Sequence, residues 1–286
     1  MTRIGDLLAA GRTFSFEFSP PKTASASLSL GHTIAELAPL GPSFASVTYG
    51  AGGSTREHTR DTVLWVRKET PVPPMAHLTC VGHTRDEISS IVSTYVEAGV
   101  DNVLALGGDP PKDPSEARPS EYEHALDLVQ HLCADFDLSI GVAAHPEGHP
   151  RSPDLATDRR HLAGKLRLAD FAITQFFFEV DHWLRLVEDL AALGVDKPVI
   201  PGIMPVTNIG QVERMAQLSG AAFPGWLRER LESGSTAEEV RRIGVEAATE
   251  LCAALLEAGV PGLHFYTLNK STATREIYAQ LGLPVA

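Results

Sequence analysis

Short runs rich in β-branched and aromatic residues recur along the chain, and each interval between them leaves room for a helix. Eight such runs are present, at 13–19, 44–49, 75–80, 102–106, 139–145, 171–178, 198–204 and 263–268. Parallel neighbouring strands need a long connection between them, which is commonly a helix. Eight strands with helical crossovers are therefore typical of a closed barrel of parallel strands.

The intervals between the runs carry helical signals. Several begin with Ser, Thr, Asp or Asn, where an N-cap would lie, and several end in Ala-Gly or Leu-Gly, where a C-cap would lie. The predicted helices cover 26–40, 55–69, 84–99, 120–136, 157–169, 181–194, 208–220 and 272–282. The long interval from 219 to 260 predicts extra helices near 221–232 and 237–259.

A doubly wound open sheet is the alternative arrangement of alternating strands and helices. Such a sheet normally carries a Gly-x-Gly-x-x-Gly turn after its first strand, and this chain has none. No linker is visible between the units. We therefore expect a single α/β domain over residues 1–286, a (β/α)8 TIM barrel with extra helices between strands seven and eight.

Composition and charge exclude several classes of protein. A net charge of −12 without a basic stripe argues against a nucleic-acid partner, because phosphate binding needs clustered Lys and Arg. Cys80, Cys133 and Cys252 lie far apart without Cys-x-x-Cys spacing, which fits a reduced cytoplasm rather than a disulfide framework. No export signal and no stretch of about 18 uncharged apolar residues is present. We expect a cytoplasmic protein without a membrane span, as a monomer or small homo-oligomer.

Barrel enzymes build their active sites at the carboxyl ends of the strands and on the loops that follow. Polar side chains stand at or just beyond that end of every predicted strand. They are Glu17, Thr48, His77, Asp109, His145, His149, Gln175, Asn208, Gln211, Tyr266 and Asn269. A strand-end Thr, Gln or Asn commonly satisfies loop backbone, so each residue alone has a structural explanation. Their convergence on one mouth is what favours an active site.

Glu17 is the strongest candidate for a catalytic residue. In the stretch 13-TFSFEFSPPKT-23, Phe14, Phe16 and Phe18 share one face of a strand and Glu17 lies on the other. A lumen carboxylate paired with Lys or Arg would be the structural explanation. Because burial in a largely apolar lumen favours the neutral carboxyl, we expect Glu17 to keep its proton near neutral pH and act as a general acid.

Two other segments carry incomplete site signals. His145, Glu147 and His149 lie close together in 145-HPEGHP-150, but the prolines prevent the helix on which a His pair would face one ion, so we expect no metal site. The segment 106-LGGDPP-111 resembles a phosphate-binding turn without the Lys-Ser/Thr pair of a P-loop. Asp109 is its notable residue.

The sequence resembles methylenetetrahydrofolate reductase in eight motifs that occur in order over nearly the whole chain. The motifs are FSFEFSPPKT, SVTYGAGG, HLTC, ALGGDPP, AAHPEGHP, AITQFFFE, IPGIMPVTN and HFYTLN. Members of this family are (β/α)8 barrels that reduce 5,10-methylenetetrahydrofolate to 5-methyltetrahydrofolate, usually through FAD reduced by NADH or NADPH. The resemblance therefore implies a tetrahydrofolate substrate and a nicotinamide dinucleotide as hydride donor.

The resemblance also implies roles for individual residues. Glu17 would be the catalytic acid that assists protonation at N10, so that the five-membered ring opens to a 5-iminium cation. The implied substrate-binding residues are Asp109, Gln175, Gln211 and Tyr266. The implied cofactor-binding residues are Thr48 and His77 at the flavin ring, with His149, Asp158 and Lys165 at the ribose and diphosphate.

Several departures from the family pattern gather at the cofactor site. Gly107 stands where flavin-dependent members carry an arginine, and His145 stands where a tyrosine is usual. Met215 replaces a phenylalanine that stacks on NADH or folate, and the segment 166–175 is one residue shorter than usual. These changes weaken the FAD site more than the pterin site, because an arginine that binds phosphate is lost.

The chain is therefore similar to the short actinobacterial branch of the family, which is thought to work without flavin. We favour NADH-dependent reduction by direct hydride transfer, with FAD absent, over the same reaction through bound FAD. Asp158 and Lys165 could hold the diphosphate of either dinucleotide. The remaining alternatives are a non-catalytic pterin- or flavin-binding barrel and a metal-dependent hydrolase that uses His145 and His149. No fingerprint separates NADH from NADPH.

Overall fold

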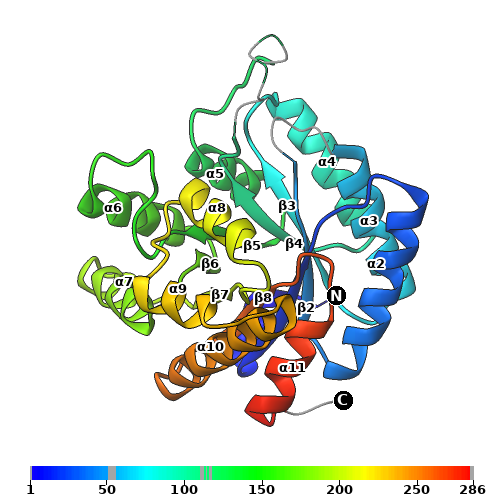
Figure 1. The fold of residues 1–286 in the computed structure, drawn as a ribbon. Helices are drawn as coiled ribbons and strands as arrows, with labels where there is room; N and C mark the ends of the chain where they lie inside the picture. Colours follow the sequence, from blue (N-terminus) through cyan, green and yellow to red (C-terminus); the bar gives the residue numbers. More distant parts are fainter. Residues whose placement is uncertain (1, 51–55, 110–112, 114, 116–117, 284–286) are drawn as a thin grey trace.

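Eight parallel strands close into a barrel (Figure 1). The structure, a computed structural model, describes residues 2–50, 56–109, 113, 115 and 118–283. Each strand pairs with its neighbours in sequence, and β8 pairs with β1. The strands are β1 (Thr13–Phe18), β2 (Phe44–Val47), β3 (Pro74–Thr79), β4 (Asn102–Leu106), β5 (Ser139–Ala144), β6 (Phe171–Phe176), β7 (Val199–Ile203) and β8 (Gly262–Tyr266). The expected (β/α)8 barrel is confirmed, and all of the predicted strands are present.

A shell of helices surrounds the barrel (Figure 1). The helices are α1 (Ile4–Ala10), α2 (Ala24–Leu37), η1 (Ala38–Leu40), α3 (Arg56–Glu69), α4 (Arg85–Glu97), α5 (Ala125–Asp135), α6 (Leu155–Leu166), α7 (Val180–Ala192), α8 (Ile209–Ser219), α9 (Gly225–Glu232), α10 (Ala237–Glu257) and α11 (Thr272–Leu281). The interval between β7 and β8 contains α8, α9 and α10, which confirms the predicted extra helices. The sequence pattern does not predict α1, because its 7 residues are too few to show helical periodicity.

Two helices begin at different residues from those that the sequence periodicity predicts, because local hydrogen bonds determine where they start. The helix predicted over 120–136 begins only at Ala125, where the Asp127 carboxylate accepts a hydrogen bond from the His124 N–H at 2.8 Å. The helix predicted over 157–169 begins earlier, at Leu155, because Asp154 accepts from the N–H of Thr157. In both cases a carboxylate satisfies an otherwise free N–H at the start of the helix.

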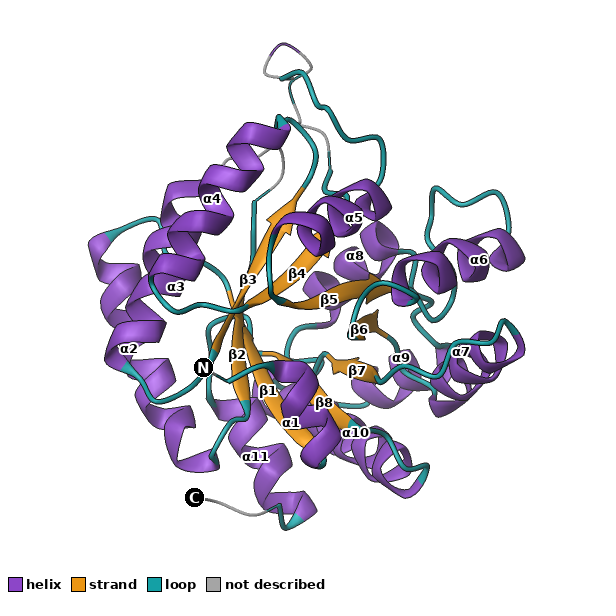
Figure 2. Ribbon diagram, turned by 180° about the vertical axis from the view of Figure 1, so that it is seen from behind, coloured by secondary structure: helices purple, strands orange, loops and turns teal. Residues whose placement is uncertain are grey.

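The part of the barrel lumen near the amino-terminal ends of the strands is filled with apolar side chains. This cluster consists of Ile4, Phe44, Met75, Leu104, Phe171, Ile173 and Ile200. Ile4 belongs to α1, which lies at the amino-terminal end of the barrel (Figure 2). The N–H of Ile4 donates to Asn102 Oδ1 at 2.9 Å. Because this end of the lumen is closed, a site inside the barrel has to open at the carboxyl ends of the strands.

Side-chain alternation along β1 separates the outer core from the lumen. Phe16 and Phe18 are buried in the core beneath the helices, and the ring of Phe16 lies 5.8 Å from that of Tyr278 on α11. Ser15 and Glu17 therefore point to the opposite face, into the lumen. The packing that the sequence predicts for this strand is confirmed.

Parts of two predicted motifs fall outside the described residues. These are positions 51–53 of the GAGG turn and positions 110 and 111 of the GGDPP segment. Among the helices that the structure describes, none is both long enough and apolar enough to cross a lipid bilayer.

Candidate active site

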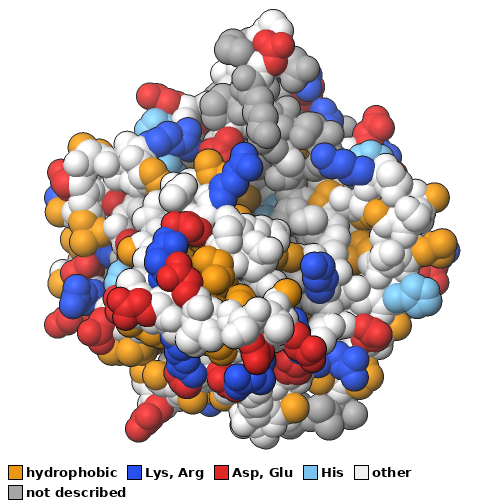
Figure 3. Space-filling view, in the orientation of Figure 1, with side chains coloured by type: hydrophobic (Ala, Val, Ile, Leu, Met, Phe, Trp, Pro, Cys, Tyr) orange, Lys and Arg blue, Asp and Glu red, His pale blue; other side chains and the backbone are white. Residues whose placement is uncertain are grey.

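The carboxyl ends of the strands form a mouth on the side of the barrel opposite α1. Helix α8 lies across this face in Figure 1, and the space-filling view of the same face shows a hollow with Lys and Arg side chains around it (Figure 3). Glu17 reaches this mouth from the last part of β1, with 17% of its side chain exposed. Its carboxylate is therefore within reach of a molecule bound at the mouth.

Two imidazoles flank the Glu17 carboxylate. Glu17 Oε2 lies 3.5 Å from Nε2 of His77 on β3 and 3.7 Å from Nε2 of His264 on β8. The phenylalanines of β1 face the other way, so the groups nearest to the carboxylate are polar rather than apolar. The prediction that Glu17 points into the lumen is confirmed, whereas the expected apolar surroundings are replaced at this layer by histidines.

His77 faces Glu17 as a neutral group. Burial lowers the pKa of His77 from 6.5 to about 4, against the opposing effect of the Glu17 carboxylate, so its ring is uncharged near pH 7. Its Nε2 is buried and has no hydrogen-bond partner in the described structure. The resemblance implies that His77 lines a flavin ring, but the structure also makes it a neighbour of the candidate acid.

The sequence does not predict three lumen residues that lie beside Glu17. Ser15, Ser46 and His264 are fully buried, and both serine hydroxyls lie within hydrogen-bond distance of the His264 ring. The period-two pattern could have found two of them, because Ser15 precedes Glu17 by two positions and His264 precedes Tyr266 by two. The neighbourhood of Ser46 depends on the pairing of β1 with β2, which no local pattern shows.

A bulge at the end of β6 places Gln175 at the mouth. Ile173 pairs with Ile200 and Phe176 with Gly202, so β6 has one more residue than β7 over this interval. Tyr266 stabilises the bulge by donating its hydroxyl to the carbonyl of Thr174 at 2.6 Å. Gly202 makes room for this contact, since an added Cβ would lie 2.6 Å from the Tyr266 ring. Tyr266 thus borders the mouth with its hydroxyl already engaged.

Burial lowers the pKa of two basic side chains on the β5 side of the mouth. The rings of His145 and His149 are 4.5 Å apart, and burial lowers the pKa of His145 to about 3, with His149 and Lys165 adding to the effect. Lys165 Nζ donates to the carbonyl of Ala143 at 3.0 Å, and burial lowers its pKa from 10.5 to about 8. His145 is therefore uncharged at neutral pH, whereas Lys165, with a pKa of about 8, stays largely protonated.

Asp158 is part of a buried ion pair. Its carboxylate lies 3.3 Å from Arg159 Nη1 and accepts a hydrogen bond from the Ser152 hydroxyl at 3.2 Å. Arg159 also donates to the carbonyls of His145 and Pro146, at 2.9 Å and 2.6 Å. Asp158 and Arg159 thus tie α6 to the loop after β5, and the structure gives Asp158 an internal partner at the position where the resemblance implies a cofactor ligand.

The other predicted site residues lie around the rim. Thr48 follows β2 and donates its N–H to the Phe18 carbonyl at 2.9 Å. Asp109 is exposed in the loop after β4, close enough to favour the charged form of His149 and so oppose the lowering of the His149 pKa by burial. Gln211 is exposed in the first turn of α8, and Met215 is half-buried on the same helix. Of the predicted residues at the strand ends, His77 is more buried than Glu17, whereas Asp109 and Gln211 are exposed.

The segment with two histidines does not gather three ligands. His145 and His149 contact each other, but Glu147 turns away to His182 at 3.3 Å and to the N–H of Ala222 at 2.9 Å. In the described part of the chain, no group of three or more His, Cys, Asp or Glu side chains is placed to hold a metal ion.

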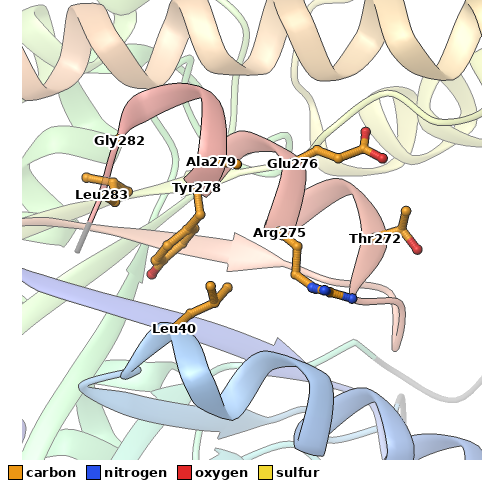
Figure 4. Close-up of a pocket in the computed structure, with 8 residues that line it drawn as sticks. All are labelled: Leu40, Thr272, Arg275, Glu276, Tyr278, Ala279, Gly282 and Leu283. Carbon is orange, nitrogen blue, oxygen red and sulfur yellow. The ribbon is translucent and has the colours of Figure 1, made fainter. Parts of the chain in front are cut away.

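A groove of about 580 Å³ lies on the outer wall between α11 and η1 (Figure 4). It is lined by Leu40, Thr272, Arg275, Glu276, Tyr278, Ala279, Gly282 and Leu283. None of the predicted site residues lines this groove. We therefore place the functional site at the mouth, where the titratable side chains converge.

Comparisons with known proteins point to one family. The family model for methylenetetrahydrofolate reductase matches residues 3–282. The 5,10-methylenetetrahydrofolate reductase of Salmonella typhimurium is 37% identical over 271 residues, covering 94% of this chain and 90% of that protein. Methylenetetrahydrofolate reductase (NADH) 1 of Arabidopsis thaliana is 36% identical over 297 residues, covering 98% of this chain and 50% of that protein.

A solved structure has a similar fold. An uncharacterised protein from Clostridium thermocellum that binds two copies of 5-methyl-5,6,7,8-tetrahydrofolic acid aligns with a TM-score of 0.69 over 96% of each chain. Its sequence is 17% identical, so this likeness supports the shared fold alone.

Proposed function

This chain belongs to the methylenetetrahydrofolate reductase family, and we propose that it reduces 5,10-methylenetetrahydrofolate to 5-methyltetrahydrofolate with Glu17 as the proton donor. The observation that carries the proposal is the placement of Glu17. It is the acidic side chain that β1 delivers into the lumen, partly exposed to the mouth and flanked by two imidazoles. Opening the substrate ring requires a proton donor held at such a position.

The chemistry divides into a proton step and a hydride step. Glu17 gives its proton to N10, the bond between N10 and the bridging carbon breaks, and a 5-iminium cation remains. That carbon then accepts a hydride and becomes the methyl group. The carboxylate left on Glu17 stabilises the cation electrostatically until the hydride arrives. One proton from solvent restores the acid after each turnover.

We assign the recognition of the pterin to Gln175 and Asp109. The amide edge of a pterin offers donors and an acceptor side by side, which a glutamine amide and a carboxylate complement. Gln175 is half-buried on the bulge of β6, and Asp109 is exposed on the loop after β4. The ring of Tyr266 and the exposed Gln211 provide the remaining contacts at the β8 and α8 sides of the mouth.

We propose that NADH supplies the hydride directly. The Arabidopsis thaliana relative carries NADH in its name, which supports this donor. The residues present fit FAD poorly, because Asp158 is paired with Arg159 and Lys165 is bonded to the wall of β5. Gly107 adds no cation in the loop after β4. Arg151 is exposed near this loop, 3.4 Å from the Gly108 carbonyl, and we assign it with His149 to the dinucleotide phosphates.

Replacing Glu17 with Gln tests the proton donor. Glu17→Gln keeps the size of the side chain and removes its proton, so kcat should fall by about 10²- to 10⁴-fold while the Kd for the folate stays within about twofold. Steady-state kinetics and folate titration measure the two quantities. The control is Glu97→Gln, an exposed carboxylate on α4 that should leave both unchanged. Near wild-type turnover in the Glu17 variant would refute the assigned role.

The visible spectrum of the purified protein tests the hydride route. Direct transfer predicts no bands near about 370 and 450 nm, where oxidised flavin absorbs. Gly107→Arg tests the opposite change, because an added Cβ at this position would meet no described atom within 4 Å and the backbone φ is not positive. We expect this variant to bind added FAD about 10-fold more tightly than the wild type. Stoichiometric flavin in the wild-type protein would overturn direct transfer.

A further inference from the structure

A chain of three buried polar residues lies next to Glu17 in the lumen. Ser15 Oγ is 2.7 Å from His264 Nδ1, and Ser46 Oγ is 3.2 Å from His264 Nε2. The same Nε2 lies 3.7 Å from Glu17 Oε2. Strand register brings these groups together, since Ser15 pairs with His264 across β1 and β8, and Glu17 pairs with Ser46 across β1 and β2.

His264 can satisfy both ring nitrogens in either neutral tautomer. A hydroxyl donates or accepts by rotating, so each serine can adapt to a protonated or an unprotonated nitrogen. The ring itself is held in place, because it is fully buried and stacks on Phe44 with centroids 5.8 Å apart and planes 15° apart. A proton can therefore change position on the ring without leaving a buried polar atom unpaired.

Glu17 needs such a neighbour because, among the described residues, no Lys or Arg side chain forms an ion pair with it. In the described part of the chain, its only ion-pair contacts are to His77 and His264. The titratable groups facing it are these two imidazoles and the hydroxyl of Tyr266, which is itself bonded to Thr174. A carboxylate formed there depends on hydrogen-bond donors held in place inside the lumen, whose dipoles stabilise charge away from water.

We propose that Ser15, His264 and Ser46 form a reversible hydrogen-bond chain that supports Glu17 in both of its protonation states. When Glu17 is ionised, His264 presents Nε2–H towards the carboxylate and Ser15 donates to Nδ1. When Glu17 holds its proton, Nδ1–H donates to Ser15 and the lone pair of Nε2 faces Glu17 and Ser46. The ring carries one proton in both arrangements, so the interchange releases one proton to solvent from one nitrogen and takes up one from solvent at the other. The three are positioning residues, and their value for turnover rests on the proposed function of Glu17.

Nitrogen-15 NMR of the His264 ring tests the chain without any substrate. In the wild-type protein, at a pH where the carbon-13 shift of the Glu17 carboxyl shows it to be ionised, the ring proton of His264 should lie on Nε2. Glu17→Gln can present an amide N–H to the ring, so its His264 should carry the proton on Nδ1. The same nitrogen protonated in both proteins would overturn the proposal, whatever the kinetics show.

Serine variants provide the kinetic test, because replacing the buried His264 could unfold the barrel. Ser15→Ala and Ser46→Ala should each lower kcat about 10-fold, the effect of one buried hydrogen bond, with the KM for folate changed less than about twofold. Thr13→Val is the matched control, since Thr13 lies on the same face of β1, is buried, and its hydroxyl has no hydrogen-bond partner in the described structure. It should leave kcat unchanged.

The outcomes separate this inference from the proposed function. A wild-type protein that does not reduce methylenetetrahydrofolate would refute the function, and the NMR comparison in the free protein would still decide whether the chain reverses. An active wild type whose serine variants keep full kcat would refute the chain alone. A rise in KM without a fall in kcat would also refute it, because that pattern indicates loss of binding rather than loss of support for the acid.

Discussion

At the scale of single residues, burial decides the charge of the side chains around the mouth. His77, His145 and Lys165 are basic residues that the sequence shows as ordinary cations or titratable groups. In the structure burial lowers the pKa of each, to about 4, about 3 and about 8. The two histidines are neutral at pH 7, so a bound substrate or dinucleotide meets polar rings there rather than positive charges.

Burial of the His145 ring should make the protein less stable at acid pH. The His145 ring has a pKa of 6.5 in the unfolded chain and about 3 when folded, so between these values the unfolded chain binds a proton that the folded protein does not. The free energy of unfolding should therefore fall as the pH drops below 6.5. His145→Tyr removes this titration and should reduce the loss by a few kcal/mol at most, because the ring is half-buried and partly solvated.

Urea unfolding at a series of pH values measures this effect. The control is His58→Tyr, which changes an exposed histidine on α3 and should leave the acid sensitivity of the protein unaltered. Equal loss of stability in the wild type and in His145→Tyr between pH 6.5 and pH 3 would contradict the assigned environment of His145.

At the scale of elements, one arginine connects three parts of the β5 side of the mouth. Arg159 on α6 is 3% exposed and contacts Asp158 on its own helix, Asp189 on α7, and two carbonyls of the loop after β5. That loop carries His145 and His149. The position of these histidines therefore depends on a side chain outside the mouth.

Removing Arg159 should destabilise the protein and disturb this loop. Arg159→Met keeps much of the buried volume and leaves the Asp158 carboxylate without its cation, which should cost about 3 kcal/mol of unfolding free energy. Arg160→Met is the matched control, because Arg160 is exposed and its guanidinium donates to the Thr157 hydroxyl on its own helix, and it should cost less than about 0.5 kcal/mol. Denaturant unfolding compares the two variants, and equal values would show that the ion pair contributes nothing.

The difference between local and long-range information explains what the sequence could predict. The strands and most helices follow from periodicity and capping residues, which are local. Alternation with phenylalanines predicts that Glu17 lies in the lumen. No local pattern predicts His264 and Ser46 as its neighbours, because only the closure of β8 onto β1 and the register of β2 bring them together. The bulge that presents Gln175 likewise arises from the pairing of β6 with β7.

At the scale of the whole molecule, the barrel separates stability from chemistry along its axis. Apolar side chains and α1 close the amino-terminal end, and polar side chains occupy the layers above them. Glu17 and the Ser15–His264–Ser46 chain lie between the apolar cluster and the mouth. A substitution in the apolar cluster should therefore change the free energy of unfolding with little effect on turnover.

Ile4→Ala tests this separation. Ile4 is fully buried against the apolar cluster, so truncation leaves a cavity and should lower the free energy of unfolding by about 2 to 4 kcal/mol. Asp6→Asn, an exposed change on the same helix, should cost less than about 0.5 kcal/mol. The kcat of both variants should match the wild type at temperatures where they remain folded, as circular dichroism and steady-state kinetics can establish together. A folded Ile4→Ala protein with a much lower kcat would mean that packing at the closed end of the lumen is transmitted through the histidine layer to Glu17.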